Sequence, residues 1–454
     1  MVFANIAVAV ATATALFSSV SNGLPSGTLY TAETYSEAPN TTTKCGKKSH
    51  KNTTNTDVKF DFRKEKIRGV NTGGWFVLEP WITPSIFEAT PDTVVDEYTY
   101  CQTLGKDEAL KRLSEHWKTF YVEDDFADMA KIGLNFVRIP IGYWSVSPLD
   151  GDPYVQGAYK YLEKAVGWAD KAGLKVMIDL HGAPGSQNGF DNSGKRGPVG
   201  WGKNDTVAQT LTALNKIRDD YASHPAVASI ELLNEPAGTW GVDKGIVEKF
   251  YTQGYNNLAS SGVAVAIHDG FLGVDAWNDW AADKPRALMD THHYEIFDVS
   301  SLLASPSDHV SVACKFGAKM AKNKMWTISG EWTGAITDCA KWLNGRGIGA
   351  RYDGNFHPEN GNAETIPIGS CEGLTTGKVS DLSDKNKQNI KNFIAAQITA
   401  YEKADGWMFW AWRTESAPEW HFKDLVAEGL IPLPLGSVDG CKDVVIPNRV
   451  ASSS

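Results

Sequence analysis

From residue 227 the chain reads Val227-Ala228-Ser229-Ile230-Glu231-Leu232-Leu233-Asn234-Glu235-Pro236. Its first seven residues are mostly apolar or β-branched, as in a strand buried on both faces of a parallel sheet. Pro236 cannot donate a hydrogen bond to a sheet and biases the preceding residue toward an extended backbone. We therefore expect an extended Glu235 whose carboxylate points out of the end of the sheet. A strand-capping loop with one solvated glutamate is the alternative interpretation.

A second stretch has the same design. Met325-Trp326-Thr327-Ile328-Ser329-Gly330-Glu331-Trp332 is again an apolar run that reaches a glutamate, with aromatic neighbours. Retaining glycoside hydrolysis needs two carboxyl groups about 5 Å apart, of which one protonates the leaving oxygen and the other attacks the anomeric carbon. Two glutamates at the ends of two strands therefore predict this chemistry.

Six further apolar runs of strand length occur along the chain. They are Ile67–Asn71, Asn135–Ile141, Leu174–His181, Val263–His268, Ala287–Tyr294 and Gly406–Trp412. Helical patterns lie between many of these runs, at Asp125–Ile132, Tyr159–Ala172, residues 206–222 and Asp384–Lys403. The alternation predicts the α/β class, as a single (β/α)8 TIM barrel with elaborated βα loops over residues 60–454. The alternative, an open α/β sheet, normally carries a glycine-rich phosphate loop, and the sequence has none after a strand.

The N-terminal region has a different composition from the rest of the chain. Ile6–Val20 is apolar, too short to span a bilayer, and typical of a secretory signal peptide over residues 1–23. A retained anchor is the alternative, because no lysine or arginine precedes this run. Residues 24–59 have no periodicity and predict a flexible polar lead-in. Three glycosylation sequons, at Asn40, Asn52 and Asn204, fit a secreted, extracellular or cell-wall protein.

Charge and composition restrict the partners. The formal net charge of −10 argues against nucleic acid, because phosphate binding requires a basic face. Sixteen tryptophans and fifteen tyrosines are compatible with carbohydrate binding, although core packing explains most single rings. We expect no membrane insertion of the mature chain, and a monomer.

Signals for other chemistries are missing from the sequence. Six cysteines show no Cys-x-x-Cys spacing, which disfavours a zinc or redox site and leaves their pairing open. His181, His292 and His293 could be core histidines or metal ligands, but no His-x-x-x-His or His-Glu-x-x-His spacing occurs. A serine hydrolase would show a Gly-x-Ser-x-Gly elbow, which is also absent. We therefore expect neither a metal nor a cofactor.

Polar and aromatic residues at the predicted strand ends form one set, because a barrel builds its active site there. They are Arg138, His181, Asn234, Glu235, His292, Tyr294, Glu331 and Trp410 or Trp412. Arg138 would keep Glu331 ionised, Tyr294 would donate a hydrogen bond to it, and Asn234 would hold a sugar hydroxyl. Glu235 needs a raised pKa to act as an acid, and Glu331 a low pKa to stay anionic. One of the two tryptophans would form the floor of the sugar site.

These motifs resemble glycoside hydrolase family 5. The closest resemblance is to the fungal exo-β-1,3-glucanases, from about Phe60 to Leu435. It is carried by Gly69–Trp75, Glu79–Pro84, Phe136–Trp144, His181–Gly189 and Trp407–Trp420.

This resemblance implies roles for individual residues. Glu235 would be the acid/base and Glu331 the nucleophile, with Arg138, His181, Asn234, His292, Tyr294 and one tryptophan binding glucose. Glu79 and Asp191 would bind the hydroxyls of the terminal sugar, and Phe190 and Phe297 would flank the entrance. The resemblance also implies the disulfides Cys314–Cys441 and Cys339–Cys371, with Cys101 free.

Three features depart from the pattern of the exo-glucanases: the lead-in with Cys45, Thr72 at a usually apolar position, and the Gly- and Asn-rich segment 344–377. The sequence predicts a secreted, metal-independent retaining hydrolase. We expect it to release glucose from the non-reducing ends of β-1,3-glucans in cell-wall glucan metabolism, with transglycosylation as a side activity. The alternatives are an endo-acting β-1,4- or β-1,6-glucanase and a catalytically silent glucan-binding wall protein.

Overall fold

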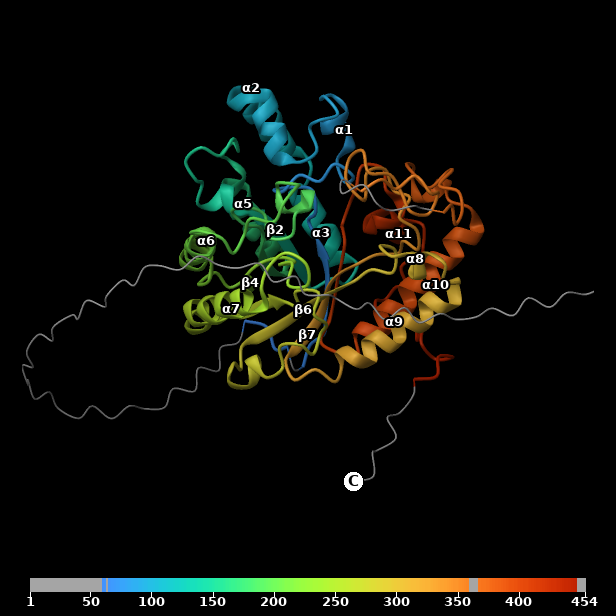
Figure 1. Ribbon diagram of the computed structural model, residues 1–454. Helices are drawn as coiled ribbons and strands as arrows, with labels where there is room; N and C mark the ends of the chain where they lie inside the picture. Colours follow the sequence, from blue (N-terminus) through green and yellow to red (C-terminus); the bar gives the residue numbers. More distant parts are fainter. Residues whose placement is uncertain (1–58, 63, 359–365, 447–454) are drawn as a thin grey trace, which may run out of the picture. The chain divides into compact units, whose positions relative to one another are not determined.

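The computed structural model describes residues 59–62, 64–358 and 366–446 (Figure 1). Eight parallel strands close into a barrel in the order of the sequence, which confirms the predicted (β/α)8 fold. The strands are β1 (Ile67–Asn71), β2 (Phe136–Gly142), β3 (Lys175–Gly182), β4 (Val227–Glu231), β5 (Ala264–His268), β6 (Ala287–His293), β7 (Trp326–Trp332) and β8 (Gly406–Phe409). The predicted signal peptide, most of the lead-in, Cys45, Asn40 and Asn52 lie outside the described residues.

Helices surround the barrel and build its loops. They are α1 (Pro84–Glu88), α2 (Glu97–Thr119), α3 (Glu123–Lys131), α4 (Tyr143–Val146), α5 (Ala158–Ala172), α6 (Thr206–Tyr221), α7 (Lys244–Leu258), α8 (Val299–Leu302), α9 (Pro306–Met320), α10 (Asp384–Tyr401) and α11 (Phe422–Ala427). Short 3-10 turns lie at η1 (Asp191–Ser193), η2 (Ala259–Ser261), η3 (Trp280–Asp283), η4 (Val379–Asp381) and η5 (Pro418–Trp420). The predicted helical patterns correspond to α3, α5, α6 and α10, and Gly173 caps α5 in a left-handed conformation.

Two strands end two or more residues earlier than the apolar pattern predicts. Strand β4 ends at Glu231 rather than Leu233, and β8 ends at Phe409 rather than Trp412. Beyond β4, the amides of Leu232 and Asn234 still bond to carbonyls of neighbouring strands. The chain therefore continues along the barrel before it turns at Glu235.

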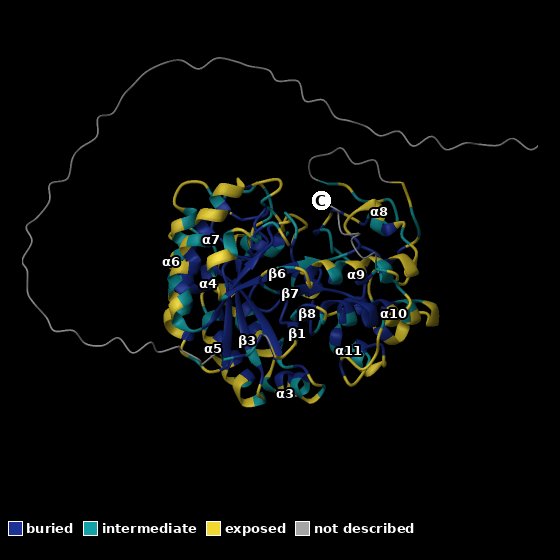
Figure 2. Cartoon of the chain, turned by 90° about the horizontal axis from the view of Figure 1, so that it is seen from below, coloured by how far each residue is buried: buried dark blue, intermediate teal, exposed yellow. Residues whose placement is uncertain are grey.

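Apolar side chains fill the space on both sides of the strands. Figure 2 shows buried strands at the centre and helices whose outer faces are exposed. Inside the barrel, Phe60 and Phe62 pack against residues of the strands, among them Phe136 and Ile328. Between strands and helices lies the larger cluster, where Gly317 on α9 allows close approach to the backbone of Ala400 on α10. The polar residues described below therefore sit on a rigid, well-packed frame.

Two disulfides stabilise the C-terminal half. Cys314 pairs with Cys441 and Cys339 pairs with Cys371, as the resemblance implied, while Cys101 is free and buried. Among the described residues, no helix has the length and apolar character needed to cross a bilayer.

Candidate active site

Arg138 lies at the centre of the barrel and is fully buried. Its Nη1 donates to Oε1 of Glu331 at 2.8 Å, and its Nη2 donates to Oδ1 of Asn234 at 2.8 Å. Its Nε donates to Oε2 of Glu231 at 2.8 Å. Asp179 lies 3.1 Å from Nη2. Burial of so many acidic groups is tolerated because they share this permanently charged guanidinium.

Glu331 is held from several sides near the end of β7. Besides the contact with Arg138, Tyr294 donates its hydroxyl to Oε2 of Glu331 at 2.9 Å. The preceding residue must be glycine, because a Cβ on Gly330 would lie 2.1 Å from the carboxylate oxygens of Asp290. The Gly330 amide instead donates to Asp290 at 2.7 Å. The predicted contacts of Arg138 and Tyr294 with Glu331 are therefore confirmed.

Glu235 faces the same space from the loop after β4. Its Oε1 lies 2.7 Å from Nδ1 of His292, and its Oε2 accepts a hydrogen bond from Asn192 at 3.2 Å. The predicted extended backbone is wrong, because Glu235 has a φ of 45°. This left-handed conformation is disfavoured for residues other than glycine and is typical of strained functional positions. Local packing and the His292 contact therefore override the bias imposed by Pro236.

His292 connects the two glutamates. Its Nδ1 lies 2.7 Å from Glu235 and 3.5 Å from Oε2 of Glu331. Burial opposes its charge, but Glu331, Asp290 and Glu235 raise the pKa of His292 well above its usual value. His292 therefore forms a hydrogen bond with Glu235 and lies at ion-pair distance from Glu331, and both carboxylates favour its charged form.

The pKa values of the two glutamates differ from the expected pattern. Burial raises the pKa of Glu235, but the hydrogen bond and charge of His292 outweigh burial and lower it to about 2. Burial raises the pKa of Glu331 despite the nearby cations His292 and Arg138. The expectation of a raised pKa for Glu235 and a low pKa for Glu331 is thus wrong, because the charge of His292 favours the ionised form of Glu235 while burial dominates at Glu331.

Glu79 and Asp191 form a second buried acidic pair near the site. Burial and the charge of Asp191 raise the pKa of Glu79 well above its usual value, and its Oε2 accepts a hydrogen bond from Trp81 at 2.9 Å. Burial raises the pKa of Asp191 to about 7. Oδ2 of Asp191 is buried without a hydrogen-bond partner among the described residues. These carboxyl groups are thus available for hydroxyl ligands.

His181 and Asn234 each have a buried polar atom without a hydrogen-bond partner among the described residues. His181 places Nδ1 2.6 Å from Asp179, while its buried Nε2 has no partner in the described part of the chain. The same holds for Nδ2 of Asn234, whose Oδ1 is bound by Arg138. Buried polar atoms are normally satisfied. Two such groups beside Glu235 and Glu331 therefore indicate a polar ligand.

The two candidate tryptophans lie in different places. Trp410 stacks on His181, with ring centroids 5.4 Å apart, and belongs to the site. Trp412 does not: its Nε1 donates to Asp125 of α3, and its ring packs near Phe422 of α11. Of the two alternatives, Trp410 is therefore the tryptophan that lies beside the other candidate site residues. Residues two apart in an extended segment normally share one face, so the strand period alone could not tell the two rings apart.

Phe190 and Phe297 are exposed at the rim. Their exposed fractions are 45% and 41%, and Phe297 contacts Tyr294 with ring centroids 5.5 Å apart. Asn204, the described sequon, is also exposed, before α6.

Several site residues were missed by the sequence analysis. They are Asn71, Asp179, Asn192, Glu231, His268 and Asp290. Asp179 and Asp290 each stand two residues before a predicted site histidine, so the strand period of two places them on the same face. That signal was available in the sequence. Asn192 lies in a loop, where no such periodicity exists.

Glu235, His268 and His292 could also be considered as metal ligands. Their ligand atoms lie within 4.8 Å of one another. However, Glu235 and His292 stand only 2.7 Å apart, whereas ligands around a tetrahedral zinc lie about 3.3 Å from each other. The observed spacing is that of a hydrogen bond.

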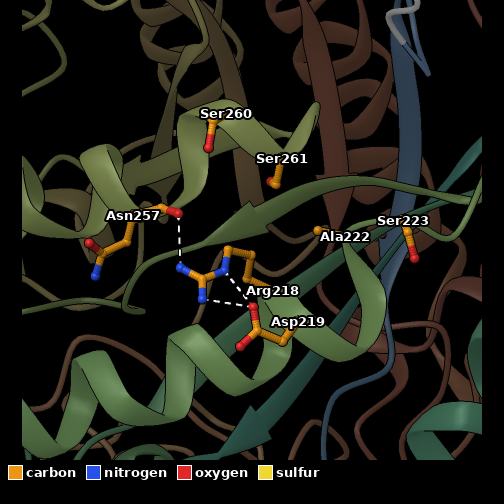
Figure 3. Close-up of a pocket in the computed structure, with 7 residues that line it drawn as sticks. All are labelled: Arg218, Asp219, Ala222, Ser223, Asn257, Ser260 and Ser261. Carbon is orange, nitrogen blue, oxygen red and sulfur yellow. Dashed lines mark hydrogen bonds and ion pairs between the residues drawn. The ribbon is translucent and has the colours of Figure 1, made fainter. Parts of the chain in front are cut away.

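A separate hollow lies at the opposite end of the barrel, where α6 and α7 end (Figure 3). It is lined by Arg218, Asp219, Ala222, Ser223, Asn257, Ser260 and Ser261. Arg218 bonds to Asp219 and to the carbonyl of Asn257, so its charge joins the two helices. The polar groups around this hollow therefore contribute to the packing of α6 against α7.

Comparisons with known proteins agree with this geometry. A family model described as Cellulase (glycosyl hydrolase family 5) matches residues 101–341. The chain is 51% identical to the glucan 1,3-beta-glucosidase of Blumeria graminis, over 83% of this chain and 89% of the relative. It is 49% identical to the probable glucan 1,3-beta-glucosidase A of Aspergillus terreus, over 83% of this chain and 90% of that relative. The rutinosidase of Aspergillus niger has a similar fold, with a TM-score of 0.64 at 18% identity, over 82% of this chain and 99% of that structure.

Proposed function

Because this chain belongs to glycosyl hydrolase family 5, we propose that it is a retaining glucan 1,3-β-glucosidase that releases glucose from the non-reducing ends of β-1,3-glucans. Two relatives at about half identity are named glucan 1,3-beta-glucosidase and probable glucan 1,3-beta-glucosidase A. The observation that carries the proposal is the bridge from Glu235 through His292 to Glu331.

The spacing of the glutamates supports retention. Nδ1 of His292 lies 2.7 Å from Oε1 of Glu235 and 3.5 Å from Oε2 of Glu331, so these two oxygens are at most about 6 Å apart, whereas inverting enzymes separate their carboxyl groups by about 6.5–9.5 Å. An inverting enzyme needs that room for a water molecule. The shorter separation supports direct attack by one carboxylate.

In the first step, Glu331 attacks the anomeric carbon and forms a glycosyl ester, while the leaving oxygen takes a proton from Glu235. Arg138 and Tyr294 orient the attacking carboxylate. Substrate binding excludes water and disfavours the charged pair Glu235 and His292 relative to its neutral form. The proton then moves from Nδ1 to Oε1 across the 2.7 Å hydrogen bond. Glu235 thus becomes an acid without taking a proton from solvent.

In the second step, water attacks the anomeric carbon, and Glu235 takes its proton as a base. Cleavage of the ester returns Glu331 to its anionic form and releases β-glucose. If a sugar hydroxyl replaces this water, the same step produces a new glycosidic bond. Transglycosylation is therefore part of the proposal.

Exo action is supported by the way three loops are tied together beside Glu79 and Asp191. Arg346, in the segment after β7, is 5% exposed and donates to Thr90 and Val94 in the segment after β1. Arg196, in the segment after β3, donates to the carbonyl of Arg346 at 2.9 Å. Loops joined in this way would close one end of the sugar site, so only a chain terminus could enter.

We also propose that the enzyme is secreted and acts on cell-wall glucan. Supporting features are the apolar run Ile6–Val20 and the exposed sequon at Asn204.

The test is proton NMR of a fresh digest of a soluble β-1,3-glucan, with Glu331→Gln as a variant. We expect glucose as the first product, in its β-anomeric form, and no turnover by the variant although it still binds sugar. First formation of oligosaccharides would indicate an endo-acting enzyme. First formation of α-glucose would refute retention, and wild-type rates in the variant would refute the role of Glu331. Sugar binding without turnover of any β-glucan would indicate a glucan-binding protein.

A further inference from the structure

The end of β6 is held from outside the barrel by a side chain of α10. His292 and Tyr294 bond to the two glutamates of the site, whereas His293 between them points toward the helices, because alternate residues of a strand lie on opposite faces. The ring of His293 stacks on Phe316 of α9 with centroids 4.0 Å apart. Its Nδ1 lies 2.7 Å from the hydroxyl of Tyr401 on α10. The strand that carries two site residues therefore has a fixed point on this helix.

The same hydroxyl leads to the end of β7. It donates to Oε1 of Gln397 at 3.0 Å, and Nε2 of Gln397 donates to the carbonyl of Thr333 at 2.8 Å. Tyr401 and Gln397 are four residues apart, so they lie on one face of α10, and both are fully buried. Thr333 directly follows Trp332, the last residue of β7. A continuous chain of hydrogen bonds thus links β6 to β7 through α10.

The direction of each hydrogen bond in this chain is determined. The carbonyl of Thr333 only accepts, so the amide nitrogen of Gln397 faces it and the amide oxygen faces Tyr401. A hydroxyl has one hydrogen, which Tyr401 donates to that oxygen, so Nδ1 of His293 donates to Tyr401. Burial lowers the pKa of His293 to about 3, so its imidazole is neutral and this bond uses its only ring hydrogen. The chain therefore has one hydrogen-bond pattern, which makes it rigid.

Regular backbone pairing does not fix the two strands at this point. The register of β6 against β7 shifts between Thr291 and His292, so that His292 pairs with Glu331 and Gly330 has no counterpart on β6. A bulge of this kind leaves one residue unpaired and disrupts the hydrogen-bond ladder. In this register Nδ1 of His292 lies 2.7 Å from Glu235 and 3.5 Å from Glu331. The hydrogen bonds through α10 hold both strands just beyond the bulge.

We propose that Tyr401 and Gln397 are positioning residues for the reaction: they fix the ends of β6 and β7 in the register that places His292 between the two catalytic glutamates. This inference rests on the proposed function. Both residues lie on the helix side of the barrel wall, so they act only through the strand ends. Their loss should slow the chemical steps and leave binding of glucose by Glu79 and Asp191, on the segments after β1 and β3, nearly unchanged.

The experiment measures kcat and KM for phenyl β-glucoside and laminaritriose, together with the inhibition constant of glucose. Tyr401→Phe removes one hydroxyl and keeps the buried ring; we expect kcat to fall about fivefold to tenfold while the inhibition constant stays within about twofold of wild type. Gln397→Met removes both hydrogen bonds of that side chain and should give the same pattern. Because the two residues belong to one chain, kcat of the double variant should lie within about twofold of that of Gln397→Met.

Tyr255→Phe is the matched control. Tyr255 lies on α7, is 7% exposed, and accepts a hydrogen bond from the amide of Arg286, which precedes β6 at the opposite end of the barrel. This variant should keep the wild-type kcat. Unchanged kcat in Tyr401→Phe or Gln397→Met, an equal loss in Tyr255→Phe, or a rise in the inhibition constant that matches the loss of kcat would overturn the positioning role and leave the proposed function intact. A wild-type enzyme that cleaves neither substrate would instead refute the proposed function.

Discussion

Replacing Tyr294 by phenylalanine removes one hydroxyl from the site and leaves the ring. The hydroxyl donates to Oε2 of Glu331 at 2.9 Å, while Arg138 holds the other oxygen at 2.8 Å. A hydrogen bond to a charged group contributes about 1.5–3 kcal/mol, and one pKa unit corresponds to about 1.4 kcal/mol. Loss of a donor to the ionised form should therefore raise the pKa of Glu331 by about one to two units.

The sign of the effect follows from the role of Glu331. A nucleophile must be ionised, so kcat/KM falls as the pH drops below its pKa. Burial already raises that pKa above its usual value. In Tyr294→Phe the acidic limb of the pH profile should move to higher pH, so that kcat/KM at a given pH on this limb falls about tenfold to hundredfold.

The measurement is kcat/KM for an aryl β-glucoside as a function of pH, for wild type and Tyr294→Phe. Tyr161→Phe is a matched control, because Tyr161 lies on α5 at the outside of the barrel. An acidic limb that stays in place in Tyr294→Phe would refute this reasoning. A uniform loss at every pH would indicate that the hydroxyl positions substrate rather than the charge of Glu331.

Three further predictions concern the proton, the loops and the disulfides. In Glu235→Gln, the pH profile of kcat/KM for an aryl β-glucoside with a good leaving group should lose its alkaline limb, and hydrolysis of β-1,3-glucan should be nearly abolished. Equal losses of kcat/KM on both substrates would contradict the role of Glu235 as the acid. Arg346→Ala should lower the unfolding free energy by about 2–4 kcal/mol in urea titrations, and oligosaccharides should then appear among the early products. The control is Arg112→Ala: this side chain is 38% exposed, and its loss should lower the unfolding free energy by less than about 1 kcal/mol. Replacing Cys314 and Cys441 by serine should cost about 5 kcal/mol for a 127-residue separation, measured by thermal unfolding without reductant; a change below about 1 kcal/mol would exclude a stabilising role.

Much of the frame was predictable because burial on both faces leaves long apolar runs in the sequence. The ends of the eight predicted runs lie within three residues of the observed strand ends. The pairing of Glu235 with Glu331 followed from the rule that parallel strands bring their carboxyl ends together. The exceptions lie where tertiary contacts override local preference, as at Glu235, whose φ of 45° opposes the bias from Pro236.

Protonation could not be predicted in the same way. The role of Glu235 as an acid requires a raised pKa, and this requirement was the basis of the prediction. The observed pKa depends on the neighbouring His292, whose position is set by a bulge between Thr291 and His292 that shifts the register of β6 against β7. In this register His292 pairs with Glu331 and reaches Glu235. No local pattern in the sequence specifies that shift, and the location of the proton depends on it.

The partners of the two glutamates explain why their roles are not interchangeable. Glu331 is bound by Arg138, whose guanidinium does not release a proton in proteins, and by the Tyr294 hydroxyl, whose pKa is raised by burial and by the charge of Glu331. Neither of these two hydrogen-bond donors can supply a proton near neutral pH, and Nδ1 of His292 is 3.5 Å from Glu331, so Glu331 is suited to remain a nucleophile. Glu235 is bound by His292, an imidazole that carries a transferable proton and lies 2.7 Å away. Acid catalysis therefore belongs to Glu235 because of what lies next to it, although burial acts on both glutamates in the same direction.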